Sequence, residues 1–531
     1  MPRVVRIDLE GRAHELRERA ATLARPLHAA ANAATTVACE RAMLRLFGVA
    51  GIDGAGRPLA LEVTDRFARL GPARLGGGIA LPFAAAAREY ALGPQELSLE
   101  IASGHIDLGL EADLLREPPN RAAAEALVSE WMAAAWQRFD ANRVARSELR
   151  AILGEAAQTV IGLDLPDLTA GQAAERGREL VAAGAGLVRV RVPRDRELRR
   201  GLGEELDPAD AAAAPRAAPA GRQRGLALLR TAIDEAAAAS GHYVRLGSAS
   251  LGLAAPDQAV VAGFERVDLV CSDPLESIVE FGVQPSRAFA DHAFALQIHG
   301  RSGAQLAVGA GPLAVAPELA RGEPVDPGTR SGRALALQAL TVELSRLGPL
   351  PPERILLGAL PREAQALGGS SPVAMTEVAL RRLVFPEHPL LIEEVSGHPA
   401  GWAAALAASI TGGMAPAMVL RPAPLEGAAT AAVAETRAAL EAAVWLADGR
   451  AVGPLRGRAL EHAEAALKAA IATLRALSHD GWGWLLSGVP SPGRGTHEEP
   501  ETDAWFGAPG PVPRRDAFDP FAIPSGGAPG R

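Results

Sequence analysis

The feature that most constrains the fold is an alternation of short β-branched runs with amphipathic helical stretches, which begins near residue 158. Such an alternation is typical of βα units that build a parallel sheet. Eight strands that close into a barrel are the simplest arrangement, so we predict an α/β fold of the TIM (β/α)8-type barrel. The predicted strands are residues 158–163, 187–192, 242–247, 267–271, 294–299, 305–308, 354–358 and 390–395.

Helices are predicted between these strands, because Leu, Ile, Val and Ala recur there at spacings of three and four residues. They are residues 170–183, 225–239, 259–265, 333–347 and 373–384. An open doubly wound sheet is the alternative fold. It is disfavoured because the chain lacks a strand–GxGxxG–helix fingerprint.

The chain of 531 residues is long enough for a barrel with flanking regions. We assign residues 1–150 to an N-terminal helical layer, with helices at 40–47 and 121–139, and residues 151–415 to the barrel. Residues 416–487 form a C-terminal helical extension, with helices at 428–446 and 460–477. Residues 488–531 are a Pro/Gly-rich tail that we expect to be extended or ordered by a partner. A loop at 193–224 should lie at the carboxyl end of the barrel.

Composition narrows the partners and the compartment. The chain has 54 Lys and Arg against 62 Asp and Glu, a formal net charge of -8, so nucleic acid and anionic membranes are poor partners. It has only two cysteines, which we expect to be buried thiols in a reducing compartment. The N-terminus lacks a signal-peptide pattern, and no apolar stretch reaches the length of a membrane span. A cytoplasmic location is therefore expected.

The strong short catalytic motifs are absent. The sequence contains no GxxxxGK[ST] phosphate loop, HExxH, CxxC or GxSxG, which disfavours the usual NTPase and hydrolase readings. His292 and His299 lie close enough in sequence to share a site, although a structural role for such a pair is the more frequent outcome.

Candidate site residues follow from the barrel prediction, because strand carboxyl ends face the active site of such barrels. Asp273 precedes Pro274, so a helix N-cap is the alternative role for its carboxylate. Arg301 is a further polar residue, which follows the fifth predicted strand after His299. The candidate pocket residues are Arg191, Arg194, Arg245, Ser248, Ser250, Asp273, Glu276 and His299.

Several blocks of the sequence resemble the alpha subunit of lysine 5,6-aminomutase. The block TTVACERAMLRLFGVAG at residues 35–51 is similar to a TTVxxERAxxRLxG block of that family. The most specific similarity is HYVRLGSASLGLAAPDQAVVAGFERVDLVCSDPL at residues 242–275. Weaker similarity covers HGRSGAQLAVGAG at 299–311, FPEHPL at 385–390 and DAFDPFA at 516–522.

The resemblance implies a barrel subunit of an adenosylcobalamin-dependent radical enzyme that moves an amino group on lysine or β-lysine. In that family pyridoxal phosphate stabilises the migrating group, and a beta subunit carries the cobalamin-binding histidine and the lysine that holds pyridoxal phosphate. This chain has no Asp-x-His-x-x-Gly motif, which is consistent with the alpha role. A cobalamin-binding beta-type subunit is therefore the expected partner, and an amino acid the expected substrate.

The positions that would hold pyridoxal phosphate and substrate depart from the family pattern. The phosphate-binding run is replaced by VPRDRE at 192–197, the family's strand-three Asn by Ser248, and the stacking Tyr by Glu276. The family's pyridoxal-contacting Ser falls on Leu251, beside Ser250, and a following Arg falls on Phe281. The acidic and basic substrate anchors fall on Gly311 and Leu391.

Three hypotheses follow from these departures. The first is an aminomutase-like subunit with an altered substrate and an altered or lost pyridoxal phosphate site. The second is a non-catalytic homologue that acts as a structural or regulatory partner of a cobalamin-binding protein. The third is an unrelated barrel enzyme of the aldolase or phosphate-binding type, which is disfavoured because no Lys lies at a predicted strand end to form a Schiff base.

Overall fold

The computed structural model describes most of the chain, with gaps mainly in the connections between elements. The described residues are 8–53, 58–154, 159–166, 168–191, 223–249, 255–275, 278, 283–309, 326–359, 371–394, 416–424, 427–449, 457–482, 511–515 and 517–522. The predicted loop at 193–224 therefore lies almost wholly outside the described residues.

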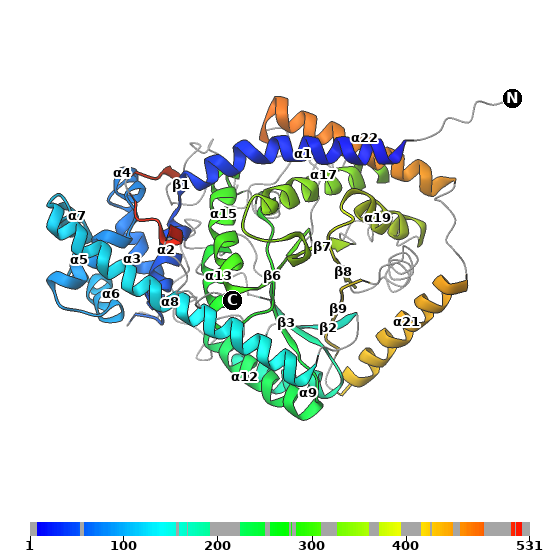
Figure 1. Ribbon diagram of the computed structural model, residues 1–531, viewed down its shortest axis with the longest axis horizontal. Helices are drawn as coiled ribbons and strands as arrows, with labels where there is room; N and C mark the ends of the chain where they lie inside the picture. Colours follow the sequence, from blue (N-terminus) through cyan, green and yellow to red (C-terminus); the bar gives the residue numbers. More distant parts are fainter. Residues whose placement is uncertain are drawn as a thin grey trace, which may run out of the picture.

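A closed barrel of parallel strands forms the centre of the molecule (Figure 1). Each strand pairs with the next one along the chain, and β9 pairs with β2 to close the ring. This confirms the predicted barrel. The strands are β2 (Val160–Leu165), β3 (Leu187–Arg191), β4 (Arg245–Ala249), β5 (Leu269–Cys271), β6 (Gln305–Val308), β7 (Ile355–Ala359), β8 (Leu390–Glu393) and β9 (Met418–Pro422).

One predicted strand is wrong. Residues 294–299 belong to helix α15 (Pro285–Ser302), which has a proline at its first position and ends at Gly303 in the left-handed conformation, with a φ of 77°. The apolar run is buried because this helix packs on neighbours along most of its length, not because it is a strand. The eighth barrel strand is instead β9, so the barrel extends beyond residue 415.

Helices surround the barrel, and all of them except α15 overlap predicted helices (Figure 1). Outward-facing strand residues and the helices share the two hydrophobic cores that enclose the ring. These helices are α9 (Ala170–Ala182), α12 (Gln223–Ser240), α13 (Ala255–Phe264), α15, α17 (Pro327–Arg346), α19 (Ser371–Val384), α21 (Ala429–Gly449) and α22 (Arg458–Asp480). A short 3-10 turn, η2 (Pro352–Arg354), precedes β7.

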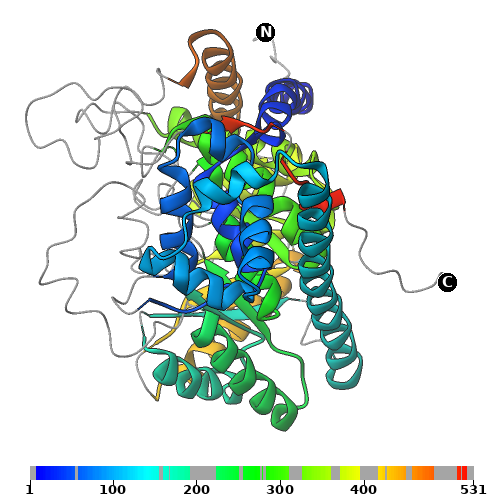
Figure 2. The ribbon, with the colours of Figure 1, turned by 90° about the vertical axis from the view of Figure 1, so that its left-hand side faces the viewer.

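An N-terminal helical layer covers one side of the barrel, and its helices after the first share a core with α13 and α15 (Figure 2). The first helix of the layer, α1 (Leu9–Asn32), packs on α15, α17 and α22, and the second, α2 (Val37–Leu46), packs on α13. Its elements are α1 (Leu9–Asn32), β1 (Ala34–Thr35), α2 (Val37–Leu46), α3 (Leu59–Ala68), α4 (Pro72–Gly76), α5 (Ala80–Glu89), α6 (Pro94–Ser103), α7 (Leu108–Leu114) and α8 (Pro118–Leu153).

A buried aspartate joins the long helix α8 to the barrel. The Asp268 carboxylate accepts hydrogen bonds from the Tyr243 hydroxyl at 2.8 Å and the Leu246 N–H at 2.9 Å. It also lies 2.9 Å from Arg146 Nε of α8 and 3.2 Å from Arg230 Nη1 of α12. Burial raises the pKa of Asp268, but the neighbouring arginines outweigh burial and lower it below its usual value. The carboxylate therefore stays ionised and holds three elements together.

The end of the chain returns to the N-terminal layer. Strand β10 (Val512–Pro513) pairs with β1, and the 3-10 turn η3 (Pro520–Ala522) follows it (Figure 1). We call residues 511–522 the C-terminal segment. This part of the predicted tail is therefore ordered by the chain itself. Across the described residues, no helix combines the length and the apolar character that a bilayer span requires.

A second buried aspartate lies between the N-terminal layer and the barrel. Asp291 of α15 accepts a hydrogen bond from the Thr36 hydroxyl, and its Oδ2 lies 3.9 Å from Arg287 Nε. The Cys39 thiol is 3.7 Å from Oδ1. Burial, only partly offset by Arg287 and Thr36, raises the pKa of Asp291 to about 6.

Asp291→Asn should therefore change how stability depends on pH. A carboxyl whose folded-state pKa is raised favours the folded state below its unfolded pKa of 3.8, and this contribution is lost as pH rises through about 6. The free energy of unfolding of the variant, relative to the parent, should rise by about 1–2 kcal/mol between about pH 5 and about pH 8. Urea denaturation across this range measures it. Asp113→Asn, at an exposed ion pair, is the control and should show no such rise.

Candidate functional site

The interior of the barrel has an apolar floor. Side chains alternate along each strand, so every second residue points inward. Nine apolar residues at these inward positions are buried against one another in a single cluster. The cluster consists of Val160, Leu187, Leu269, Cys271, Ala307, Leu356, Leu391, Met418 and Leu420.

A polar cluster lies at the carboxyl side of this floor. The guanidinium of Arg189 donates to both carboxylate oxygens of Asp164, at 3.0 and 3.1 Å. Its Nη1 also donates to Glu393 Oε1 and to the Cys271 sulfur, the latter at 3.3 Å. We call these four residues the barrel cluster. One arginine thus links four different strands across the inside of the ring.

The strand positions of these residues place the cluster at the end where barrel enzymes perform chemistry. Cys271 and Glu393 are the last residues of β5 and β8, and Asp164 is one residue from the end of β2. Arg189 lies in the middle of β3, opposite Asp164 in the strand register. Its long side chain extends from there to the other three residues.

Burial and charge define the chemistry of the barrel cluster. Burial disfavours the charged guanidinium, but Glu393 and Asp164 outweigh burial, so the pKa of Arg189 lies well above its usual value. Burial raises the pKa of the Cys271 thiol to about 11, so the thiol is neutral at physiological pH. The cluster therefore combines two carboxyl groups and a neutral thiol around one guanidinium.

Glu393 is the charged member of the cluster most accessible to solvent. Its side chain is 14% exposed, whereas those of Arg189 and Asp164 are each 6% exposed. Two inward positions near the barrel cluster carry small side chains, Ala249 in β4 and Ala307 in β6. The arrangement presents a fixed carboxylate at the end of the barrel, which favours a cationic group over an anionic one.

Ser248 does not face the barrel interior. It alternates with Gly247, whose missing side chain would lie 3.1 Å from Arg189 Cβ inside the ring. Ser248 therefore points outward like Leu246, which packs against the surrounding helices. Its hydroxyl is buried without a hydrogen-bond partner among the described residues. The predicted pocket role of Ser248 is wrong for this reason.

Asp273 is a structural cap. Its carboxylate accepts hydrogen bonds from Leu275 N–H and Gly309 N–H, both at 2.9 Å, and from the Thr341 hydroxyl at 3.0 Å. These bonds join the end of β5 to the end of β6 and to α17. The bond from the Leu275 N–H is of the kind that an N-cap aspartate accepts.

His299 lies on α15 and not at a strand end, because the predicted strand there is a helix. Burial lowers the pKa of His299 and that of His292 to about 3, so both rings are neutral. His292 contacts the Ser345 hydroxyl at 3.1 Å. Arg301 donates to the Phe521 carbonyl, also outside the barrel. No group of three or more potential metal ligands occurs among the residues that the structure describes.

Five candidates remain, two of them in described strands and three outside the described residues. Arg245 begins β4, so it lies at the amino end of the strand, where it donates to the Gln305 side chain at 3.1 Å. It lies at the opposite end of the strand from the predicted pocket because β4 starts three residues later than predicted. Arg191 is the last residue of β3. Arg194, Ser250 and Glu276 lie outside the described residues.

Comparison with known proteins places the chain. It matches the family described as "D-Lysine 5,6-aminomutase TIM-barrel domain of alpha subunit" over residues 7–390. The chain belongs to this aminomutase family. The lysine 5,6-aminomutase alpha subunit of Fusobacterium nucleatum subsp. nucleatum is 25% identical over 404 residues, which are 72% of this chain and 71% of that protein. The alpha subunit from Acetoanaerobium sticklandii is 25% identical over 367 residues, 67% of this chain and 65% of that protein.

Solved structures add little to this assignment. A rubisco-like protein from Burkholderia fungorum is 15% identical with a TM-score of 0.34, over 62% of this chain and 69% of that chain. DHPS from Yersinia pestis is 13% identical with a TM-score of 0.31, over 53% of this chain and 94% of that chain. Scores this low say nothing about the function of this aminomutase-family chain.

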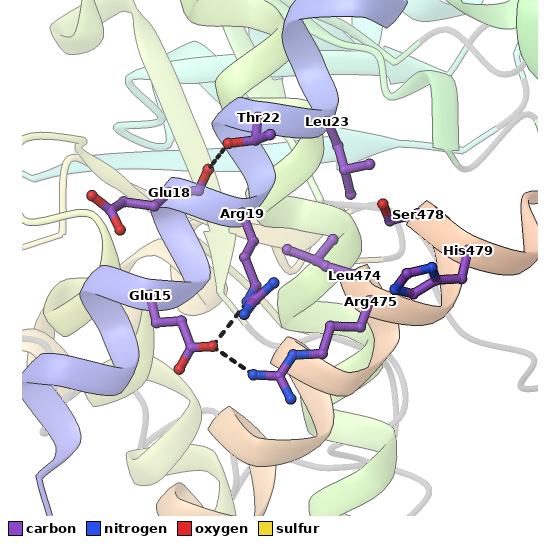
Figure 3. Close-up of a pocket in the computed structure, with 9 residues that line it drawn as sticks. All are labelled: Glu15, Glu18, Arg19, Thr22, Leu23, Leu474, Arg475, Ser478 and His479. Atoms are coloured by element: carbon purple, nitrogen blue, oxygen red, sulfur yellow. Dashed lines mark hydrogen bonds and ion pairs between the residues drawn. The ribbon is translucent and has the colours of Figure 1, made fainter.

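The barrel cluster was missed in the sequence prediction, which considered only residues at strand ends. A stronger signal is a charged residue at the inward position of an otherwise apolar strand, as in VIGLDL (Asp164) and LVRVR (Arg189). The pocket of about 300 Å³ in Figure 3 belongs to a different region. It lies on the outer surface between α1 and α22, where Glu15 bonds both Arg19 and Arg475.

Arg189→Met should strongly destabilise this aminomutase-family barrel, because it leaves two carboxylates at the end of the barrel without their cation. Removing one partner of a buried ion pair costs about 3–5 kcal/mol. The midpoint of urea denaturation measures the loss. Arg178→Met, at a surface pair with Glu235, should leave the midpoint nearly unchanged. An equal effect of the two substitutions would contradict the structural importance of the barrel cluster.

The two thiols should be unreactive in the native protein, because Cys39 and Cys271 are both free and buried. Burial also raises the pKa of each thiol, so little of the nucleophilic thiolate is present. Titration with Ellman's reagent should detect no fast-reacting thiol in the folded chain and both thiols after denaturation in guanidinium. A thiol that reacts rapidly in the native state would show that one of these sites is open.

Proposed function

We propose that the chain is the barrel subunit of an adenosylcobalamin-dependent aminomutase-type enzyme that works with a separate cobalamin-binding, beta-type subunit and without pyridoxal phosphate. The reaction would be a radical 1,2-migration of an amino group. The observation that carries this proposal is the barrel cluster, a buried set of charged residues at the carboxyl end of the barrel in a chain of the aminomutase alpha-subunit family.

The free-energy cost of burying the barrel cluster supports a catalytic role for these residues. Burying two carboxylates and a guanidinium inside a ring takes several kcal/mol of desolvation per ion, and apolar residues of similar volume usually stabilise as well or better. The floor of the same barrel is apolar. Charged groups kept at the chemically active end of such a barrel therefore indicate binding or catalysis.

Pyridoxal phosphate does not fit the described residues. Ser248 faces the helices, and Asp273 is used as a cap. The phosphate is a dianion that needs cationic and N–H donors. The barrel cluster offers two carboxyl groups instead, and its guanidinium is already bonded to Asp164 and Glu393.

The carboxyl groups of the barrel cluster suit an amine. A protonated amino group would approach Glu393, the partly exposed carboxylate, while the Arg189 fork keeps this carboxylate and Asp164 in fixed positions. Adenosylcobalamin, when bound, supplies a carbon radical that takes a hydrogen atom from the substrate. The chain's own residues would orient the amine and exclude water. Because the chain has no Asp-x-His-x-x-Gly motif, we assign the cobalamin-binding histidine to the partner.

Co-expression tests this proposal. The chain is produced with a neighbouring gene product that contains Asp-x-His-x-x-Gly, supplied with adenosylcobalamin and pyridoxal phosphate, and separated by gel filtration. We expect one peak that contains both chains and the corrinoid, without the visible absorbance band of a pyridoxal aldimine. The partner alone is the control for corrinoid binding.

Other outcomes separate the alternatives. An aldimine band would contradict the loss of pyridoxal phosphate. Two separate peaks, with corrinoid only on the partner, would contradict the assembly. A stable complex that gives no radical signal by electron paramagnetic resonance with any amine would favour the non-catalytic homologue.

A further inference from the structure

The C-terminal segment is attached to the N-terminal layer by its backbone. Strand β10 pairs antiparallel with β1, so that Ala34 lies opposite Pro513. The Arg514 N–H donates to the Ala33 carbonyl, and the Arg515 N–H donates to the Gly76 carbonyl, both at 2.8 Å. These bonds resemble the addition of a peptide strand to a sheet edge, in which main-chain bonds supply affinity.

We call the surface under this segment, which includes Gly76, Trp136 and Phe294, the socket. It allows the backbone of the segment to approach closely. A Cβ added at Gly76 would lie 2.7 Å from the Pro513 carbonyl oxygen, closer than any real Cβ contact. The absence of a side chain at Gly76 therefore allows the backbone of the segment to lie directly against α4.

An aromatic side chain anchors the other end of the segment. The Phe521 ring packs against Phe294 of α15, at 5.2 Å between ring centroids, and against Trp136 of α8, at 6.2 Å. Arg301 lies over the Trp136 ring at 4.4 Å and donates to the Phe521 carbonyl at 2.9 Å. The segment thus has two attachment points, a strand pairing and an aromatic anchor.

The contact between the segment and α15 is not packed throughout. A pocket of about 340 Å³ that opens to solvent lies between them, and polar side chains contribute to its lining, among them Gln297, Arg514 and Asp519. Domain interiors contain few voids larger than a water molecule, whereas interfaces between separate partners are often polar and hydrated. This contact therefore has the character of an interface between a protein and a peptide.

We propose that the C-terminal segment is an intramolecular peptide ligand, and that its socket recognises an extended strand followed by a phenylalanine anchor. The segment binds through its own contacts and does not need its covalent link to α22. While it is seated, it occupies the socket against any other chain that carries such a sequence.

A cleavage experiment with the full chain tests this. A protease recognition sequence is inserted between Gly493 and Arg494, and the purified protein is cut and passed through gel filtration. Mass spectrometry identifies what elutes with the body of the protein. We expect the C-terminal fragment to remain bound, and a synthetic peptide of residues 511–522 to displace it, while a scrambled peptide does not.

Substitutions in the two attachment points make the test specific. Phe521→Ala and Gly76→Ala should each lower retention of the fragment by about tenfold or more, which corresponds to about 1.4 kcal/mol. Gly171→Ala is the matched control, because a Cβ at Gly171 meets nothing within 4 Å. Circular dichroism of the uncut proteins checks that each variant is folded.

Two results would overturn the proposal. The fragment of the unsubstituted protein could separate from the body as soon as the chain is cut. Alternatively, folded Phe521→Ala and Gly76→Ala variants could retain the fragment as well as the parent does. If Gly76→Ala does not fold, Arg301→Met, which removes the bond to the Phe521 carbonyl, replaces it with the same expected loss.

Discussion

The strict alternation of side chains in a closed barrel is the constraint on which the rest of the structure depends. In a ring of parallel strands, each residue faces either the interior or the surrounding helices, and a shift of one residue exchanges the two. Asp164, Arg189 and Glu393 therefore meet inside the ring although they are far apart in sequence. The same rule turns Ser248 away from the interior.

Two buried charge clusters stabilise the barrel with opposite charge balance. One arginine, Arg189, is shared by two carboxylates inside the ring. Outside the ring, one carboxylate, Asp268, is shared by Arg146 and Arg230, with Arg150 at 3.6 Å. Each central ion offsets its desolvation by several charge-assisted hydrogen bonds. The outer cluster holds α8 and α12 on the barrel.

The charge balance of the inner cluster links the fold to the proposed chemistry. The family provides a barrel that works as an alpha subunit, and this chain keeps that barrel. At its carboxyl end, however, the described side chains favour a cation over a phosphate. A subunit that orients an amine directly, with a corrinoid supplied by a partner, agrees with both the membership and the departures.

Much of the fold followed from local sequence, because strands and helices differ in the spacing of their apolar residues. Seven of the eight predicted strands overlap barrel strands, and the Asp273 carboxylate accepts a hydrogen bond from the Leu275 N–H two residues later. The failure at residues 294–299 has a physical cause. A helix buried on most of its surface has no polar face, so a short part of it has the composition of a buried strand.

The sequence by itself determined the alternating elements, the family blocks and the absence of a cobalamin-binding histidine motif, since these depend on residue order alone. Only the tertiary structure decided which polar residues share a site. The direction of a side chain depends on the starting residue of each strand, and Arg245 moved from the predicted mouth to the opposite end because β4 begins at that residue. The contact between Val512 and Thr35 likewise joins the two ends of the chain, a distance in sequence that no local pattern can encode.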